Sequence, residues 1–315
     1  WTPEDIDAAL PPGDAALIKA WFAVTPGGNF EGTTVLSTPR SLETVAAEVG
    51  VTTDELSAAI DRSVPILLAE REKRTRPGRD EKVITAWNGM MLRAFADGGR
   101  ILHRPDFLEI ARRNASFVLD HLQRESIVLR SWKDGDARVT GFLEDYALLI
   151  DGLLALYRAT LESRWLEEAL RLAEGMIARF ASNENAGFFD AAEDHATPIT
   201  RSRDLHDGAT PSGNAVAADV LLRLGAMTGN DTWTARATAL LQSLASTMRE
   251  HPLAAGRYLS ALSFYLGPVQ ELALAGDRES DGLQALLDAS YGVYSPNLIV
   301  GYVDEGAPDL VARLP

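Results

Sequence analysis

Apolar positions after residue 86 fall into helix-length segments of two alternating kinds. Segments of the first kind are apolar around most of their circumference and cover residues 87–102, 143–160, 212–227 and 258–275. Segments of the second kind have one charged face and cover residues 106–122, 164–180 and 232–248. A helix that is apolar all round is buried, whereas a helix with one charged face lies at the surface. The alternation therefore predicts helical hairpins, each with an inner and an outer helix.

Longer segments that follow the outer helices contain short stretches typical of strands. These stretches are residues 127–132, 137–140, 188–190 and 197–200, with a turn signal at Asp134-Gly135 between the first two. Parallel inner helices would place these segments at the face where the inner helices begin. We therefore expect an all-α fold, an α/α toroid of the six-hairpin type with small β-hairpins on one face. The chain supplies about four of the hairpins, so we expect the ring to be incomplete.

The first 80 residues are also helical, but they are irregular. Thr2 is placed to cap a helix that has Pro3 at its first position. The other expected elements are helices at residues 15–22, from residue 41, and at residues 53–73, and a short strand at residues 33–36. We predict that residues 1–80 form an irregular helical N-terminal part of the toroid. Residues 81–315 then form the toroid of helical hairpins.

The composition narrows the class of protein. With 46% hydrophobic and 24% charged residues, the 315-residue chain has the make-up of a globular protein with a substantial core. Its formal charge of −15 opposes binding to a phosphate backbone, and no basic stripe compensates for it, so we expect no nucleic-acid partner. Uncharged apolar runs are too short to span a membrane. We expect a cytoplasmic protein that has no membrane partner.

Several kinds of chemistry are excluded by the residues that the chain lacks. It has no cysteine, which excludes disulfides, thiolate nucleophiles and thiolate metal sites. The sequence contains neither a phosphate loop nor a dinucleotide-binding fingerprint, and it shows no metal-ligand spacing of histidines and carboxylates. We therefore expect no cofactor and no metal. Any activity must come from carboxylates, amides, hydroxyls, histidines and aromatic rings.

Three polar loops, residues 80–89, 141–146 and 206–214, run directly into inner helices, and they carry part of a family resemblance that extends over other stretches of the chain. The matching stretches are residues 1–4, 28–32, 76–77 with 80–82, 85–89, 143–147, and 207–209 with 211–214. In these stretches the chain resembles the C-terminal part of the spermatogenesis-associated thioredoxin-domain proteins and their bacterial relatives. The resemblance implies a toroid similar to those of N-acylglucosamine 2-epimerases and six-hairpin glycosidases. It also implies an upstream thioredoxin-like domain, which we expect to be absent from this chain.

Two aspartates in these loops are candidate acid–base residues. Asp145 lies in the first turn of an inner helix, where it either complements the helix dipole or binds a ligand in the ring interior. Asp207 lies in a loop before Ser212, which is the better candidate for the helix cap and leaves Asp207 available for chemistry. Two carboxylates facing one cavity suit glycoside hydrolysis, in which their separation decides between inversion and retention.

Other polar and aromatic residues of the same loops would line the pocket. The predicted substrate-binding residues are Trp87, Asn88, Glu144, Tyr146, His206, Ser212 and Asn214. Trp87 is either a core residue or a surface on which a sugar stacks. Glu144 points about 100° away from Asp145 around the helix, which makes it the weaker candidate of the pair. The histidines do not occupy the inner-helix positions expected of an epimerase, which weakens that reading.

Two functions from different classes follow. The first is a carbohydrate-active or carbohydrate-binding α/α toroid, with an acidic pocket at the inner-helix N-termini and a small carbohydrate as ligand. Its reaction would be glycoside hydrolysis or sugar isomerisation. The alternative is a non-catalytic scaffold or client-binding module for the upstream thioredoxin-like domain. The residues leave open whether the chain is an enzyme, and which sugar it would take.

Overall fold

The computed structural model describes residues 1–182, 186–195 and 200–303. The chain divides into two compact units, Trp1–Asp80 and Glu81–Pro315. Each unit has its own buried core, and each is described by itself. In the described residues, no helix is long and apolar enough to cross a membrane.

The first unit is built from four helices, three of which begin at a residue whose side chain caps the helix. The helices are α1 (Pro3–Ala9), α2 (Pro12–Trp21), α3 (Leu42–Val49) and α4 (Thr53–Glu72). Thr2 caps α1 through its side chain, as predicted, and Thr52 caps α4 with Glu55 as the reciprocal partner. The predicted strand at residues 33–36 does not form. Thr33 instead pairs with Phe30 in an isolated bridge that closes a tight turn.

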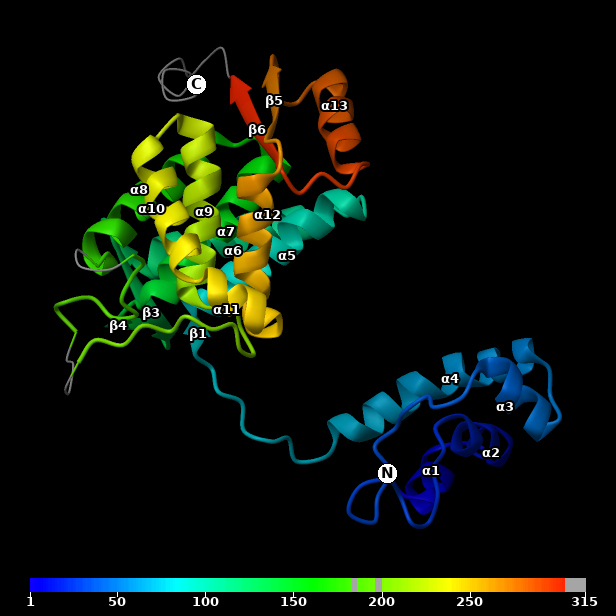
Figure 1. The fold of residues 1–315 in the computed structure, drawn as a ribbon. Helices are drawn as coiled ribbons and strands as arrows, with labels where there is room; N and C mark the ends of the chain where they lie inside the picture. The colour runs from blue at the N-terminus through cyan, green and yellow to red at the C-terminus, as the bar shows by residue number, and fades with distance from the viewer. Residues whose placement is uncertain (183–185, 196–199, 304–315) are drawn as a thin grey trace. The chain divides into compact units, whose positions relative to one another are not determined.

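The second unit consists mainly of helical hairpins (Figure 1). The hairpins are α5 (Thr85–Ile101) with α6 (Pro105–His121), α7 (Leu143–Thr160) with α8 (Ser163–Phe180), and α9 (Gly213–Thr228) with α10 (Asp231–Ser243). A further inner helix, α12 (Gly256–Leu266), packs against α9. The inner helices α5, α7, α9 and α12 follow one another side by side. This arrangement confirms the predicted class, an all-α toroid of inner and outer helices.

The inner helices run parallel: residues further along one helix contact residues further along its neighbour. From α5 to α7, Ala86 contacts Asp145 and Arg93 contacts Asp151. Two glycines allow this pair of helices to approach closely. A Cβ on Gly89 would lie 2.5 Å from the Leu148 backbone, and one on Gly152 would lie 2.6 Å from the Gly89 carbonyl oxygen. The predicted common face of inner-helix N-termini follows from this geometry.

Small strands cover the start of the α5–α7 pair. They are β1 (Val83–Ile84), β2 (Gln123–Arg124), β3 (Ile127–Lys133) and β4 (Asp136–Thr140), with β3 paired to all three others. The β3–β4 hairpin turns at Asp134 and Gly135, as predicted, and both have positive φ. The second hairpin was predicted at residues 188–190 and 197–200. In the structure, Phe188 pairs with Ala181 in an isolated bridge. Residues 197–199 lie outside the described part of the chain.

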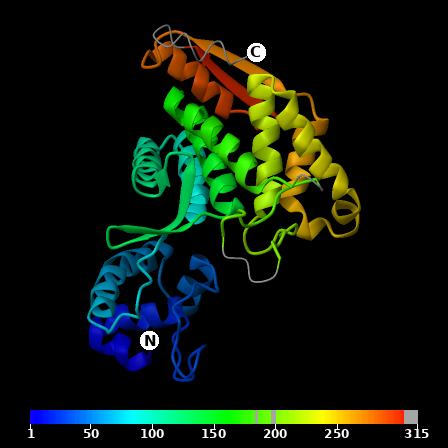
Figure 2. The ribbon, with the colours of Figure 1, turned by 90° about the vertical axis from the view of Figure 1, so that its left-hand side faces the viewer.

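The C-terminal part differs from the predicted helix at residues 258–275. Helix α12 ends at Leu266, because Gly267 and Pro268 follow it. The chain then forms β5 (Gln270–Ala275), α13 (Asp281–Tyr291) and β6 (Leu298–Val303), with β5 and β6 parallel (Figure 2). The Tyr302 N–H donates to the Tyr157 hydroxyl and so attaches this β–α–β element to α7. The predicted outer helix at residues 232–248 is also interrupted, and α11 (Ala245–Glu250) follows α10.

Candidate functional site

A polar cavity of about 490 Å³ lies where α7 and α9 begin, and we call it the mouth cavity. Three carboxylates, Glu144, Asp190 and Asp204, contribute to its wall. Its described lining is Arg130, Phe142, Glu144, Asp190, Asp204 and residues 208–213. A cavity of this size and polarity can hold a ligand as large as a sugar.

Arg130 on β3 organises one side of the mouth cavity. Its guanidinium donates to Glu144 at 2.7 Å and to Asp145 at 3.1 Å. The same guanidinium lies 5.0 Å from the ring centre of Phe142. One cation therefore serves two acidic side chains, and the Glu144 side chain keeps 35% of its surface exposed. Glu144 is accordingly available to a ligand.

A buried amide fixes the opposite side of the mouth cavity. Asn214 is fully buried in the first turn of α9. Its side chain accepts from the Phe188 N–H and donates to the carbonyl oxygens of Phe188 and Asp204. The Asp190 carboxylate accepts from the Asp204 N–H at 2.9 Å, which joins the two loops again. Asn214 thus positions the loops that carry two of the carboxylates.

Asp145 lies outside the lining of the mouth cavity. It is fully buried, and its carboxylate accepts from the backbone N–H groups of Ala86 at 3.0 Å and Phe142 at 2.9 Å. Burial raises the pKa of this carboxyl to about 6, although the two N–H groups and Arg130 oppose the rise. Asp145 therefore joins the start of α5 to the start of α7, and its geometry supports an anchoring role.

Asp207 also holds backbone groups in place. Its carboxylate accepts from Ser212 N–H at 2.9 Å and from Arg257 N–H at 2.7 Å. Arg257 is the second residue of α12, where backbone N–H groups have no partner within the helix. As expected, Asp207 is not the cap of α9, but it binds a backbone N–H in the first turn of α12, a structural role that the sequence did not predict. Ser212 does cap α9, through the Ala215 N–H.

The other predicted binding residues are dispersed. Trp87 is 61% exposed at the start of α5, and His206 is also exposed. Asn88 donates to the Ile84 carbonyl oxygen and accepts from Asn114. Tyr146 is fully buried. Of the residues predicted for the site, Glu144 and Ser212 line the mouth cavity. The described lining does not include Asp145, Asp207, Tyr146 or Asn214.

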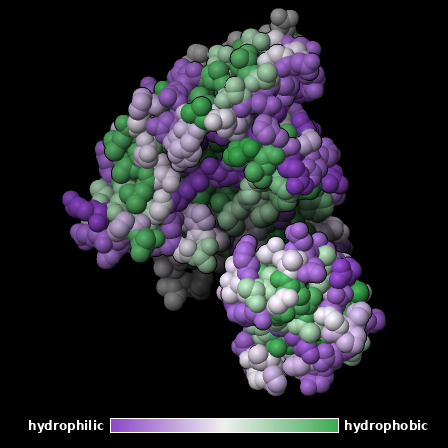
Figure 3. Space-filling view, turned by 90° about the vertical axis from the view of Figure 1, so that its right-hand side faces the viewer, coloured by the Kyte–Doolittle hydropathy of each residue, from purple (hydrophilic) through white to green (hydrophobic). Residues whose placement is uncertain are grey.

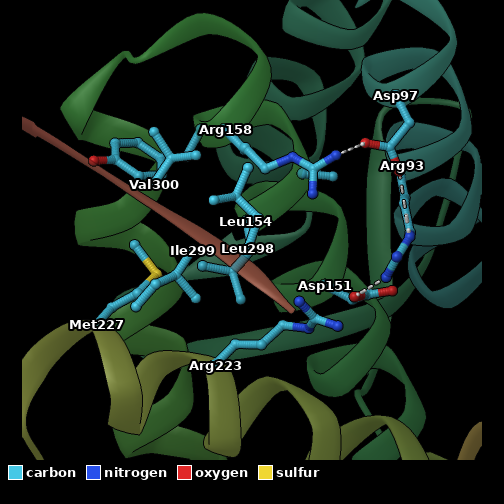
Figure 4. A pocket seen from close by; sticks show the side chains of 12 residues that line it. Arg93, Asp97, Asp151, Leu154, Arg158, Arg223, Met227, Leu298, Ile299 and Val300 are labelled. Atoms are coloured by element: carbon cyan, nitrogen blue, oxygen red, sulfur yellow. Dashed lines mark hydrogen bonds and ion pairs between the residues drawn. The ribbon is translucent and has the colours of Figure 1, made fainter. Parts of the chain in front are cut away.

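A second group of polar residues faces the interior between the inner helices and was not predicted. Its charged members are Arg93, Asp97, Asp151, Arg158, Asp219, Arg223 and Arg257. They line two adjoining cavities of about 60 and 540 Å³, which we call the interior cavity. Figure 3 shows hydrophilic residues within a hollow of this unit, and Figure 4 shows several of the charged side chains. The sequence did contain one signal for this group, namely charged residues four positions apart in otherwise apolar helices, as in Arg93 and Asp97.

Two buried aspartates connect the arginines of the interior cavity. Asp151 accepts from Arg93 and from Arg257, the latter at 2.9 Å. Asp219 accepts from Arg257 at 2.6 Å and from Arg223 at 3.1 Å. Burial raises the pKa of the Asp151 carboxyl, but the charges of Arg93 and Arg257 outweigh that effect and bring it to about 2. The Asp151 side chain is therefore ionised at neutral pH.

Together, the hairpins and the two polar cavities define an α/α helical-hairpin protein with polar groups gathered at the start of the inner helices and between them. Its sequence is related to that of spermatogenesis-associated protein 20, which confirms the predicted resemblance. The human protein is 32% identical over 299 residues, which is 91% of this chain and 38% of the human one. An uncharacterized protein of Caenorhabditis elegans is 24% identical over 298 residues, which is 92% of this chain and 40% of that protein.

Chain length, family models and solved structures give further comparisons. This chain spans less than two fifths of the length of its mammalian relatives. No family model matches it. Among solved structures, the GH76 alpha-mannanase BT2949 of Bacteroides thetaiotaomicron is similar, with a TM-score of 0.43 and 13% identity, covering 78% of this chain and 73% of that one.

Proposed function

We propose that the second unit binds a carbohydrate or a similar polyol in the mouth cavity. The observation that carries this proposal is the gathering of Glu144, Asp190, Asp204, Arg130 and the Phe142 ring around one space of about 490 Å³. Carboxylates and guanidinium groups bind hydroxyls by charge-assisted hydrogen bonds, and an aromatic ring offers a face for the apolar side of a sugar.

In this proposal the acid–base residues are carboxylates that line the mouth cavity, and not the predicted Asp145 and Asp207. Glu144 is the first candidate, because its side chain is partly exposed and Arg130 orients it. Asp190 and Asp204 lie on the facing loops and supply a second carboxyl group for glycoside hydrolysis or for proton transfer in sugar isomerisation. Asp145 and Asp207 position these groups through the backbone N–H groups that they bind.

A scaffold for a thioredoxin-like domain remains the alternative. That function requires no ligand pocket and is compatible with an inner-helix ring whose centre is filled by side chains. The described inner helices, together with the end of α13 and the segment after it, instead line a cavity of about 540 Å³, the larger part of the interior cavity. This observation favours ligand binding over a purely structural role.

Ligand-observed NMR with a panel of neutral monosaccharides and disaccharides tests the proposal. We expect at least one sugar to bind the 315-residue chain, and Glu144→Gln to weaken its binding about tenfold, because a charge-assisted hydrogen bond is lost. Glu167→Gln is the matched control, since Glu167 is exposed on the outer helix α8. It should leave binding unchanged.

Turnover of the bound sugar is followed in the same samples. Loss of turnover in Glu144→Gln, with Glu167→Gln still active, supports a catalytic carboxylate. Binding without turnover in the unsubstituted chain assigns the mouth cavity to recognition alone. The proposal fails if no sugar of the panel binds, or if Glu144→Gln binds as tightly as the unsubstituted chain.

A further inference from the structure

The interior cavity receives one arginine from each of four successive inner helices. Arg93 comes from α5, Arg158 from α7, Arg223 from α9 and Arg257 from α12. The aspartates that line it are Asp97, Asp151 and Asp219. Arginine stays protonated in proteins, so four arginines against three aspartates leave one positive charge in excess. This local excess stands out in a chain whose formal charge is −15.

The arginines of the interior cavity keep unused hydrogen-bond donors. The Nε of Arg257 is buried and has no hydrogen-bond partner among the described residues. Arg158 donates from Nε to the Tyr291 hydroxyl, and its nearest carboxylate, on Asp97, is 3.6 Å away. A guanidinium group has five N–H donors, so the bonds formed within the cluster do not exhaust it. Buried donors without acceptors are unfavourable, and a bound acceptor would relieve that.

The space beside these donors is large enough for a small molecule. The larger part of the interior cavity measures about 540 Å³. Its lining also includes Ser260, Ser263, Ser290 and Tyr291, and the hydroxyl of Tyr291 accepts from Arg158. Guanidinium groups bind carboxylates and phosphates in a bidentate geometry, whereas hydroxyls suit the polar remainder of such a ligand. The cavity therefore combines an excess cation with neutral hydrogen-bonding groups.

We propose that the interior cavity is a binding site for a small organic oxyanion, bearing one carboxylate or phosphoryl group and hydroxyls. The oxyanion neutralises the excess charge and accepts from Arg158, Arg223 and Arg257. This site differs from the mouth cavity in its lining residues, so its ligand need not be the sugar proposed there.

Calorimetric titration of the 315-residue chain with inorganic phosphate, and separately with acetate, tests this inference. Sodium chloride keeps the ionic strength constant, because exposed charges are sensitive to salt. We expect saturable binding of at least one of the two anions at millimolar concentrations. Preferential binding of phosphate identifies a phosphoryl ligand, and preferential binding of acetate identifies a carboxylate.

Substitutions locate the bound anion. Arg158→Gln removes one cation and leaves the bonds of Asp151 and Asp219 intact, and it should weaken anion binding roughly tenfold or more. Arg223→Gln is the second variant and should have a similar effect, with circular dichroism confirming the helical content of both. Arg164→Gln is the matched control, because Arg164 lies exposed on the outer helix α8.

The outcomes separate the two cavities. Unchanged anion binding in Glu144→Gln, together with weakened binding in Arg158→Gln and Arg223→Gln, supports the interior site. If neither anion binds, or if both arginine variants bind as the unsubstituted chain does, the inference is overturned. A change in anion binding in Glu144→Gln, most simply an increase because Arg130 loses a competing carboxylate, also overturns it, because the anion then occupies the mouth cavity.

Discussion

Two buried aspartates on helix α7 differ sharply in how the protein holds their charge. Asp145 and Asp151 lie less than two helical turns apart, and both have at most 5% of their surface exposed. Burial raises the pKa of Asp145 to about 6, whereas Arg93 and Arg257 overcome the effect of burial and lower the pKa of Asp151 to about 2. Their surroundings, and not the depth of burial, set their ionisation.

The difference follows from the partners of each carboxylate. Asp145 receives two neutral backbone N–H groups and shares Arg130 with Glu144. Asp151 receives two guanidinium groups directly. The start of α7 thus uses its aspartate as an anchor for backbone, while the middle of α7 belongs to an ionic network around a cavity. The start and the middle of α7 therefore belong to two different kinds of polar site.

The largest effect is expected when the ionic network loses an anion. Asp151→Asn leaves Arg93 and Arg257 without a shared carboxylate, and we expect a loss of about 3–5 kcal/mol in the free energy of unfolding. Urea denaturation followed by circular dichroism measures this loss. Asp106→Asn is the control, because Asp106 pairs with Arg104 at an exposed site and should change stability by less than about 1 kcal/mol. Equal effects of the two substitutions would contradict the contrast.

The two aspartates should also respond to pH in opposite directions. The folded-state pKa of Asp145, about 6, exceeds its usual value of 3.8, so its contribution to stability is greatest below pH 4 and falls as the pH rises through 6. The size of this fall is about 3 kcal/mol. The pKa of Asp151 is lowered, so its contribution is complete above pH 4 and is lost as the pH falls towards 2.

Denaturation of the substituted chains between pH 3 and pH 8 isolates each contribution. The stability of the unsubstituted chain relative to Asp145→Asn should decrease between pH 4 and pH 7. Its stability relative to Asp151→Asn should be constant over the same interval. Parallel pH profiles for the two comparisons would show that the aspartates do not differ as described.

Both aspartates contact α5, so the spacing of α5 and α7 affects them together. Gly89→Ala places a methyl group 2.5 Å from the Leu148 backbone, and we expect it to cost about 1–3 kcal/mol by forcing the helices apart. Gly98→Ala is the matched control in the same helix. Its methyl group would meet only the Phe107 ring at 3.6 Å, and the gain in helix propensity should keep the chain at least as stable. Denaturation that ranks the two variants in reverse would exclude this close approach.

The smallest effect is expected at Asp207, which, like Asp145, binds backbone N–H groups. Asp207→Asn leaves one acceptor oxygen for the Ser212 and Arg257 N–H groups, and it should cost about 1 kcal/mol as a weakened helix cap. Hydrogen exchange of the first turn of α12 should accelerate, while exchange in α5 stays unchanged. Faster exchange throughout the unit would assign Asp207 a wider role.

The sequence predicted the helical hairpins because burial leaves a clear periodic trace in each helix. It also located the start of α7 and α9 as polar, where the mouth cavity lies. It did not predict that Glu144, and not Asp145, faces that cavity. Asp145 is directed instead at the backbone of Ala86, 59 positions earlier in the chain, and local spacing carries no information about such a partner.

The interior cavity was missed for a related reason. Arg93, Asp151 and Arg257 lie in segments whose pattern is mainly apolar, and their mutual contacts depend on which inner helices are neighbours. The helix predicted through residue 275 was wrong because Gly267 and Pro268 end α12, and the residues beyond them form β5, which pairs with the distant β6. Long-range contacts set what local patterns leave undetermined.

The most direct test of the contrast along α7 is an NMR titration of the aspartate side-chain carboxyl carbons, with Asp145→Asn and Asp151→Asn providing the assignments. We predict that the Asp145 signal titrates near pH 6 and that the Asp151 signal stays in its ionised position down to about pH 2. Titration of both signals together near the usual aspartate value of about 4 would contradict the difference between these two carboxylates.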